Sequence, residues 1–267
     1  MDDLFLLSER QMARIAPHFP LSHGVPRVDD RRVVSGIVYV IRHGLQWKDA
    51  PKGYGPHKTL NCRAYDPTYA YEMAVIPDHG ARRMMGEQAD EFYYVTAMNE
   101  GYAQPSMPEG VAEGIIRGLY SLSGPAAGAA AVRLLGSGAI LPEVVAAAAL
   151  LSADWGIEAE VMSATSFSEL AREAREVERR ILLGDDDALS HVERLLPGDA
   201  PIVAATDDVR AYPQLIASYV EAPFVALGTD GFGRSDTRPA LRAFFEVDCK
   251  HVVLAALHAL ARSRPTP

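Results

Sequence analysis

The stretch from Gly228 to Asp236 has residue types and spacing that could support chemistry. Three glycines (Gly228, Gly231 and Gly233) lie there beside charged residues of alternating sign (Asp230, Arg234 and Asp236), directly after the apolar run 224–227. Glycines after a strand can let the backbone approach a phosphate, but these three miss the dinucleotide-binding spacing. We therefore predict a structural strand-to-helix loop tied together by its charged side chains, with phosphate binding as the alternative.

Composition limits the classes of protein that the chain can be. Its 267 residues are 48% apolar, enough for one large core or two modest ones. Residues 1–63 carry 10 Lys and Arg against 6 Asp and Glu, whereas the remainder carries 16 against 29. An acidic main body is not typical of nucleic-acid binding, so we expect no nucleic-acid partner for it.

Cysteine usage and the apolar runs point to the cytoplasm. Cys62 and Cys249 are the only cysteines, and neither has a Cys or His nearby at metal-ligand spacing, so we expect no disulfide framework and no metal site. The acidic start does not resemble a signal peptide. The longest uninterrupted apolar run, 144–151, is far shorter than the roughly 20 residues of a membrane span.

The first 60 residues predict a small helical unit. Ser8 and Gln11 have the spacing of a capping box, and a second helix should run from Asp29 or Asp30 to His43 with its apolar residues at helical spacing. Arg31, Arg32 and Arg42 lie mostly off that apolar stripe. They favour a solvated surface, with DNA binding by the basic helix as the weaker alternative. The histidines His18, His23, His43 and His57 are interpreted as surface or turn residues.

From residue 61 onward, strands and helices alternate, which is typical of a mostly parallel α/β sheet with helices on both faces. The strands are predicted at 92–95, 131–135, 159–163, 202–205 and 224–227, and the clearest helices at 142–154, 168–183 and 252–262. The small, turn-prone stretch 121–128 separates a strand-poor segment from this regular pattern, so we place a domain boundary there.

Two parts of the chain resemble two unrelated families. The phrases 42–51 and 54–60 resemble the N-terminal region of insertion-sequence transposases. The phrases 65–76, 99–102, 107–110, 135–138, 165–172 and 228–238 resemble, in order, the homodimeric type of pyruvate dehydrogenase decarboxylating subunit, a transketolase-like enzyme. We expect a transposase-like helical fragment at 1–60, the tail of a pyrimidine-binding domain with a linker at 61–123, and a transketolase-like C-terminal domain at 124–267.

The resemblance implies thiamine diphosphate and magnesium as cofactors, and oxidative decarboxylation of pyruvate with acetyl transfer to a lipoyl carrier. However, residues 61–267 contain no Gly-Asp-Gly element for the diphosphate and metal, and the family's catalytic glutamate would lie upstream of the junction at 60/61. Glu72 is interpreted instead as a surface carboxylate. His79, near the end of the predicted helix that begins at Tyr69, is the candidate catalytic residue, with a helix-end histidine as the alternative.

These observations predict a fragment of pyruvate dehydrogenase that is inactive as this chain alone. The alternative is a noncatalytic module that forms a homo-oligomer or pairs with an intact dehydrogenase subunit. The family's partner is the lipoyl acyltransferase, but the docking region for that partner would also lie upstream of residue 61. No membrane is expected as a partner.

Overall fold

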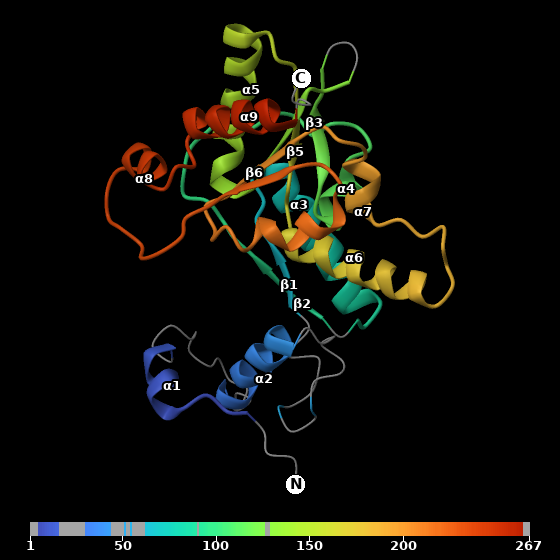
Figure 1. Cartoon of the computed structure of the whole chain (residues 1–267). Coiled ribbons are helices and arrows are strands. Elements are labelled where there is room, and N and C mark those ends of the chain that lie inside the picture. Colours follow the sequence, from blue (N-terminus) through green and yellow to red (C-terminus); the bar gives the residue numbers. More distant parts are fainter. Residues whose placement is uncertain are drawn as a thin grey trace. The chain divides into compact units, whose positions relative to one another are not determined.

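The computed structural model describes residues 5–15, 30–43, 51, 54, 62–89, 91–125 and 129–263. Contacts divide the chain into two compact units. The first contains Met1–Arg63 and Gly80–Tyr94, and the second contains Ala64–His79 and Val95–Pro267. The described residues do not include His18, His23 and His57, which we interpreted as surface or turn residues. They also exclude most of the transposase-like phrases 42–51 and 54–60. Figure 1 shows the whole chain.

The N-terminal part of the first unit contains the two predicted helices, α1 (Glu9–Ile15) and α2 (Asp30–His43). The capping box at the start of α1 is confirmed, because the Ser8 amide donates to Oε1 of Gln11 at 2.8 Å and the Gln11 amide donates to Oγ of Ser8 at 3.3 Å. The Leu7 amide donates to Oγ of the buried Ser35 at 2.8 Å. This bond joins the chain before α1 to the middle of α2.

Two short strands, β1 (Cys62–Tyr65) and β2 (Phe92–Val95), pair into a two-stranded sheet. The chain between them forms α3 (Ala70–Ala81) and one π-helical turn, Arg82–Gly86. The predicted strand 92–95 is confirmed, whereas β1 and the π-helical turn were not predicted. Pro77 lies inside α3, where it removes one backbone hydrogen-bond donor from the helix.

A five-stranded sheet forms the centre of the second unit, with the strand order β3-β5-β4-β6-β7. Four of its strands are parallel neighbours: β4 (Val132–Gly136), β5 (Ala159–Ser163), β6 (Ile202–Ala205) and β7 (Phe224–Leu227). In the register, Leu134 lies opposite Val161 on one side and Val203 on the other. The predicted mostly parallel sheet is confirmed, and its four parallel strands match the predicted ranges within one residue.

The edge strand β3 (Tyr120–Ser123) corrects one expectation. Residues 121–123 were expected in a turn, but they pair antiparallel with β5, with an irregular register between Ser121 and Ser123. Tyr120 is buried and Ser121 is exposed, so this strand has one face in the core and one in solvent. The helix α4 (Ala112–Arg117) precedes it and ends at Gly118, which has a left-handed φ of 100°.

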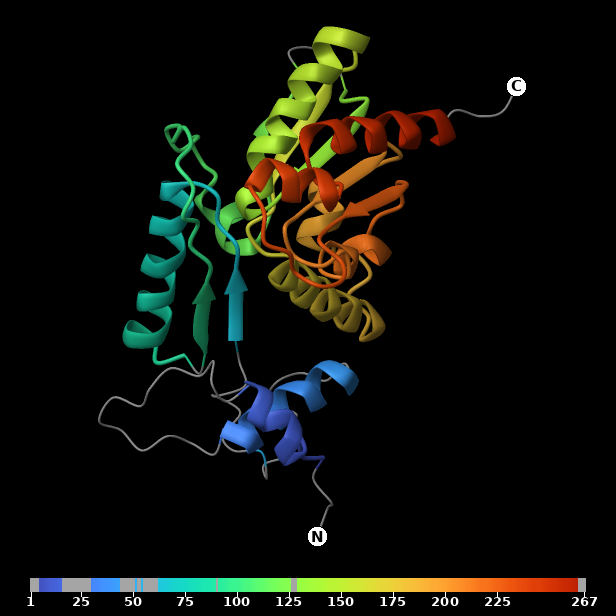
Figure 2. The ribbon, with the colours of Figure 1, turned by 90° about the vertical axis from the view of Figure 1, so that its left-hand side faces the viewer.

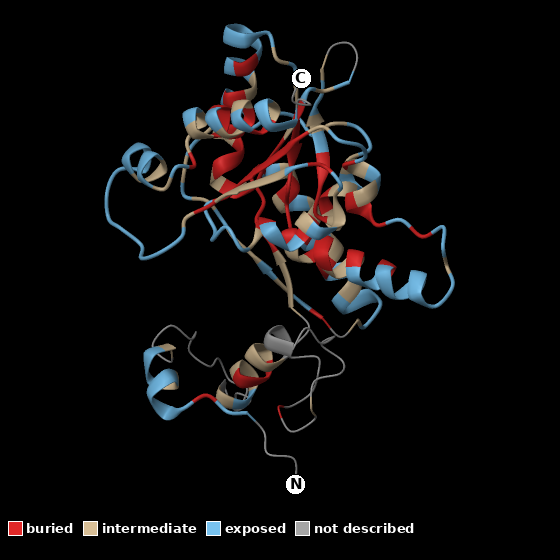
Figure 3. Cartoon of the chain, in the orientation of Figure 1, coloured by how far each residue is buried: buried red, intermediate tan, exposed pale blue. Residues whose placement is uncertain are grey.

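Helices cover both faces of the five-stranded sheet, as predicted (Figures 1 and 2). On one face lie α5 (Leu141–Trp155), which follows a single 3-10 turn at Gly138–Ile140, and α9 (Cys249–Ser263). On the other lie α6 (Phe167–Leu182), α7 (His191–Leu195) and the 3-10 helix Pro213–Tyr219. The short helix α8 (Arg238–Phe244) precedes α9. The buried residues concentrate in the sheet and in the helix faces toward it (Figure 3).

Local sequence signals explain where α5 begins and ends and where α6 begins. Pro142 lies in the first turn of α5, where its missing N–H costs nothing, and Gly156 ends that helix with a left-handed φ of 61°. Ser166 caps α6 by accepting a hydrogen bond from the Glu169 amide at 3.1 Å. Sequence alone therefore locates these helices to within one residue.

One stretch among the described residues, Gly138–Trp155, is long and apolar enough to cross a membrane by length and composition alone. A core helix of a soluble protein passes the same test. Leu141, Val144, Ala147 and Leu151 are completely buried in the core cluster that α5 shares with the sheet and α9. The packing of these four side chains is that of a core helix.

Candidate functional site

The glycine loop, which we define as residues Gly228–Asp236, follows β7 at the carboxyl edge of the sheet. Asp230 accepts two hydrogen bonds from Arg210, one from the backbone amide at 2.9 Å and one from Nε at 2.5 Å. Asp236 accepts a bond from the Thr237 amide at 2.7 Å. The guanidinium of Arg234 lies over the Phe244 ring, 4.0 Å from its centroid. Each charged residue of the loop therefore contacts a residue outside the loop: Arg210, Phe244 or Thr237.

The glycines of the loop differ in what they do. Gly228 is buried, and a Cβ there would lie 2.6 Å from the carbonyl oxygen of Asp208 and 2.7 Å from the amide nitrogen of Arg210. Gly231 has a φ of 97°, which an L side chain rarely adopts. Nothing lies within 4 Å of a Cβ at Gly231 or Gly233. Gly228 is therefore required by the close approach of the neighbouring backbone, and Gly231 by its own backbone conformation.

His79, the candidate catalytic residue, lies in the last turn of α3 and is half-buried. A histidine in the last turn of a helix interacts favourably with the helix dipole when it is protonated. A catalytic role for His79 stays a prediction.

The structure brings the segment before α3 to the carboxyl ends of β4 and β5. The Asp66 amide donates to the carbonyl oxygen of Thr165 at 2.7 Å, and the Gly138 amide donates to the carbonyl oxygen of Asp66 at 3.2 Å. Oγ1 of Thr68 donates to the carbonyl oxygen of Gly138 at 2.8 Å. We call these four residues together with Glu72 the tail–sheet joint. It unites three of the phrases that carry the family resemblance.

Glu72 is the centre of the tail–sheet joint and corrects our expectation of a surface carboxylate, because it is completely buried. Its Oε2 accepts hydrogen bonds from the amides of Thr68 at 2.5 Å and Tyr69 at 2.9 Å. Its Oε1 accepts bonds from Oη of Tyr120 and Oγ of Ser163, both at 2.6 Å. Four donors from its own chain therefore occupy both carboxylate oxygens.

Tyr120 extends the polar cluster around Glu72 toward Tyr71, whose Oη lies 2.6 Å from its own. Burial and the charge of Glu72 raise the pKa of Tyr120 well above its ordinary value. Burial likewise raises the pKa of Tyr71 to about 12. Both phenols keep their protons at physiological pH and can donate hydrogen bonds. Sequence reasoning missed this cluster, although a glutamate at the third position of a helix that reaches back to the N-cap amide is a recognisable signal.

Asp66 is also buried, and its carboxylate is poorly satisfied. Oδ1 accepts a hydrogen bond from Oγ1 of Thr96, whereas Oδ2 has no partner among the described residues. The carboxylate lies so close to Gly138 that a Cβ on that glycine would overlap both of its oxygens. Burial raises the pKa of Asp66 to about 7, and the nearby negative charges of Asp207 and Asp208 add to this shift.

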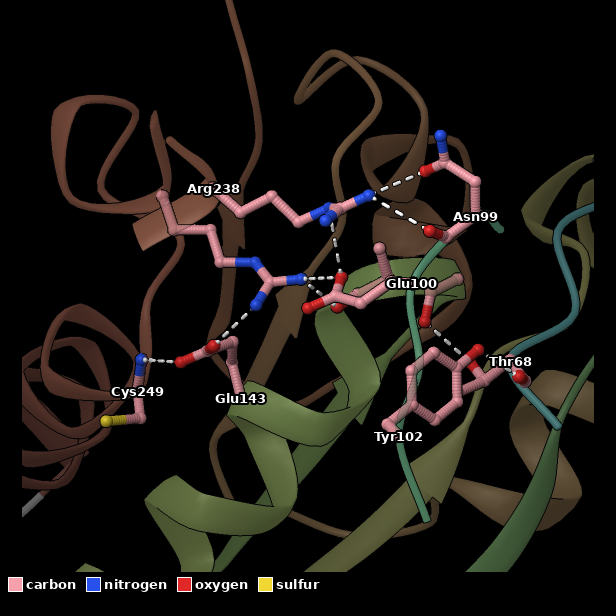
Figure 4. A network of polar contacts seen from close by, with 10 residues as sticks. Thr68, Asn99, Glu100, Tyr102, Glu143, Arg238 and Cys249 are labelled. Carbon is pink, nitrogen blue, oxygen red and sulfur yellow. Dashed lines mark hydrogen bonds and ion pairs between the residues drawn. The ribbon is translucent and has the colours of Figure 1, made fainter. Parts of the chain in front are cut away.

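A second set of polar contacts ties residues 99–102 to α8, as Figure 4 shows. Nη2 of Arg238 donates to Oδ1 of Asn99 at 2.6 Å and to its carbonyl oxygen at 3.2 Å. Nε of Arg238 lies 3.6 Å from Oε2 of Glu100. Tyr102 donates to the carbonyl oxygen of Thr68 and so links this set to the tail–sheet joint.

Arg242 bridges two carboxylates in the same region. Its Nη2 donates to Glu100 at 2.6 Å, and its Nη1 donates to Glu143 at 3.0 Å. Glu143, in the first turn of α5, also accepts a bond from the Cys249 amide at the start of α9 at 3.0 Å (Figure 4). The side chain of Arg242 is only 15% exposed. These contacts connect residues 99–102, α5, α8 and α9.

The residues present do not fit thiamine diphosphate with a divalent metal. Among the described residues, no group of three or more His, Cys, Asp or Glu side chains is arranged to hold a metal ion. The carboxylate of Glu72 is enclosed and fully hydrogen-bonded, so it has no free oxygen for an external ring nitrogen. The arrangement can hold the tail against the sheet, and it presents no geometry from which a cofactor-dependent step follows.

Comparison with known protein families separates the chain into the two parts that the sequence suggests. The family described as the transketolase-like TK C-terminal domain matches residues 118–248. A family of IS4/5 transposases matches residues 7–67. The expected boundaries at 60/61 and 123/124 stay predictions.

Individual relatives match the larger part of the chain. The chain is 52% identical over 223 residues to the pyruvate dehydrogenase E1 component of Pseudomonas aeruginosa and 44% identical over 232 residues to that of Escherichia coli K12. These matches cover 82% and 85% of this chain but only 25% and 26% of the relatives. A transketolase variant from Pichia stipitis, solved with fructose 6-phosphate, shares the fold with a TM-score of 0.55 at 18% identity over 76% of this chain and 26% of that chain.

The fold and the relatives agree on the larger part of the molecule. The chain spans about a quarter of the length of the curated relatives that it matches. Residues 118–248 form a transketolase-like C-terminal domain, most of the chain is homologous to about a quarter of the pyruvate dehydrogenase E1 component, and an IS4/5 transposase-like segment lies at the N-terminus.

Proposed function

We propose that this chain is a noncatalytic member of the pyruvate dehydrogenase E1 family. The family reaction, thiamine-diphosphate-dependent oxidative decarboxylation of pyruvate with acetyl transfer to a lipoyl carrier, is not carried out by this chain alone. We place the protein in the cytoplasm and assign the lipoyl acyltransferase to the family only.

The observation that carries the proposal is that Glu72 cannot replace the family's catalytic glutamate, which would lie upstream of the junction at 60/61. Thiamine catalysis needs a glutamate oxygen that is free to hydrogen-bond the aminopyrimidine ring of the cofactor. Glu72 is completely buried, and its two oxygens already accept four hydrogen bonds from the chain itself. Freeing one oxygen would leave buried donors without an acceptor, at about 1–3 kcal/mol for each donor. The carboxylate therefore serves the fold.

The test is pyruvate-dependent reduction of an artificial electron acceptor by the purified chain, with thiamine diphosphate and magnesium in excess. We expect no cofactor-dependent rate from a sample whose circular dichroism shows it to be folded. The intact E1 component of Pseudomonas aeruginosa serves as the positive control in the same assay. Turnover that requires thiamine diphosphate would overturn the proposal.

A second candidate function, self-association or pairing with an intact dehydrogenase subunit, is favoured by an apolar patch at the end of α6. Leu182 is 85% exposed and Leu183 is 77% exposed, far more than is usual for adjacent leucines in a monomer. They lie beside a groove of about 400 Å³ that Val177, Ile181 and Leu189 help to line. We call Ile181, Leu182, Leu183 and Leu189 the α6 patch.

Equilibrium sedimentation tests this second function. We expect the wild-type chain to associate at high concentration and the double variant Leu182→Gln, Leu183→Gln to remain monomeric. Leu254→Gln, which alters a leucine on α9 that is 63% exposed, is the matched control and should associate like the wild type. A wild-type chain that stays monomeric and does not bind intact E1 would refute this function.

DNA binding by the N-terminal segment is the weaker alternative. Arg32 is exposed on α2, whereas Nε of Arg31 donates to the carbonyl oxygen of Leu7 at 2.6 Å. At least one cation of the predicted basic face thus contributes to the fold of the segment. A mobility-shift assay with duplex DNA at two salt concentrations tests this alternative, because phosphate-driven binding weakens steeply as salt rises.

A further inference from the structure

A pocket of about 350 Å³ opens at the carboxyl edge of the five-stranded sheet. Its lining comes from the segments that follow three neighbouring parallel strands: Ala139 and Ile140 after β4, Asp207 after β6, and Thr229 with Arg234 after β7. Glu100 and residues within and after α8 complete it. The pocket therefore lies where parallel strands end, and not on an arbitrary part of the surface.

The strand order independently indicates a ligand site at this position. From β4 the chain crosses to β5 on one side of the sheet and then continues to β6 on the opposite side of β4. The connections after β4 and β6 therefore diverge, and they leave a crevice at the carboxyl ends of these two strands. Open parallel α/β sheets bind their ligands in such crevices. Ile140 and Asp207, one from each connection, both line the pocket.

The walls combine an apolar surface with a few polar groups, as is usual for small-molecule sites of about 300–1,000 Å³. Apolar residues that line the pocket are Ala139, Ile140, Leu241, Phe245 and Val247. Val247 is buried, and Ile140 is almost completely buried. A ligand with an apolar body could cover the partly exposed Ala139, Leu241 and Phe245 and gain stability from removing their apolar surface from water.

Three arginines line the pocket, and their binding partners differ. Arg242 is held by Glu100 and Glu143, and Arg238 by Asn99 and Glu100. Arg234 is different, because its guanidinium stacks on the Phe244 ring and forms no hydrogen bond or ion pair with the part of the chain that the structure describes. The N–H donors of a guanidinium lie in its plane, so stacking leaves them available for another group.

We propose that this pocket binds a small organic anion, a carboxylate or phosphate on an apolar body, with the anion held by Arg234. Planar guanidinium groups bind both types of oxyanion through two parallel N–H···O bonds. Asp207 and Glu100 are carboxylates in the lining, so loss of Arg234 would make the pocket less favourable for anions. The site is independent of the proposed noncatalytic role and of the α6 patch.

Isothermal titration calorimetry tests the site with three probes that share one ring. Phenyl phosphate and benzoate carry the two possible anions, and phenol carries none. We expect at least one of the two anions to bind the wild-type chain and phenol to bind about tenfold more weakly or not at all. The tighter anion identifies the head group. A folded wild-type chain that binds neither anion, or binds phenol equally well, would overturn the proposal.

Variants of Arg234 test its role, and because this residue is exposed they should fold normally. Arg234→Gln should weaken the anion about tenfold, whereas Arg234→Lys should have an intermediate effect, since it keeps the charge but loses the planar pair of donors. Arg262→Gln, which removes an exposed arginine from the last turn of α9, is the matched control and should bind like the wild type. Equal binding by Arg234→Gln and Arg262→Gln would assign the anion to another residue and refute the proposal.

Discussion

The tail–sheet joint and the glycine loop both derive from phrases that carry the family resemblance, yet they use their charged residues in opposite ways. In the joint, Glu72 is buried and accepts four hydrogen bonds from its own chain. In the loop, Arg234 is exposed, and its guanidinium contacts only an aromatic face among the described residues. Saturated buried groups stabilise a fold, whereas exposed groups with free donors remain available to a ligand. The following variants test that difference.

The largest expected effect is from Glu72→Ala in the joint. The substitution leaves the amides of Thr68 and Tyr69 and the hydroxyl groups of Tyr120 and Ser163 without their shared acceptor. We expect the free energy of unfolding to fall by about 4 kcal/mol, measured by urea denaturation. Glu109→Ala, at an exposed position, is the matched control and should change it little. A small effect of Glu72→Ala would mean that water satisfies these donors and that the joint is not a stabilising centre.

The second effect is the pH dependence that Asp66 confers, a fall of about 3 kcal/mol in the free energy of unfolding between pH 4.5 and 7.5. Its folded-state pKa of about 7 is above the ordinary 3.8, so the folded chain binds more protons than the unfolded chain between these values. The contribution of Asp66 to stability is therefore largest below about pH 4 and is lost as the pH rises through about 7. Asp66→Asn should reduce this slope in unfolding measurements from pH 4.5 to 7.5. An unchanged slope would assign the titration to other groups.

Arg242→Ala should lower the free energy of unfolding by about 2 kcal/mol, because it leaves Glu100 and Glu143 as neighbouring, partly buried carboxylates without their shared cation. Thermal unfolding of the variant measures the loss. Arg262→Ala removes an exposed guanidinium of the same size and should leave the unfolding temperature nearly unchanged. If the two variants behave alike, the contacts between residues 99–102, α5 and α8 do not contribute to stability.

The smallest effect is expected in the glycine loop. Gly231→Ala should destabilise by about 1 kcal/mol through backbone strain alone, because the φ of 97° is unfavourable for alanine and no atom lies near the added Cβ. Gly233→Ala, where the backbone has no such φ and the space is also open, should be nearly neutral. Chemical denaturation of the two variants compares them directly. Equal effects would show that the turn conformation of the loop is not fixed by Gly231.

Much of the fold could be predicted because its signals are local. The runs 159–163, 202–205 and 224–227 are strands at their predicted bounds, since short apolar runs between turn residues are typical of buried parallel strands. Tyr120–Ser123 was missed because two serines beside a glycine and a proline resemble a turn, and only pairing with β5 makes it a strand.

The candidate site was less predictable, since its members are distant in sequence. Glu72 was interpreted as exposed because helix periodicity does not reveal which face of α3 meets Tyr120 and Ser163, which are 48 and 91 residues away. The contact of Arg238 with Asn99 spans 139 residues. No spacing rule relates positions so far apart.

The sequence by itself determined the two families, the mostly parallel sheet and the helices that cover it, because composition, periodicity and capping residues act over a few neighbouring positions. The tertiary structure alone decided which carboxylates are buried. Burial depends on where distant strands end, and it sets whether a carboxylate such as Glu72 or Asp66 stabilises the fold, titrates near neutral pH or remains free to meet a ligand.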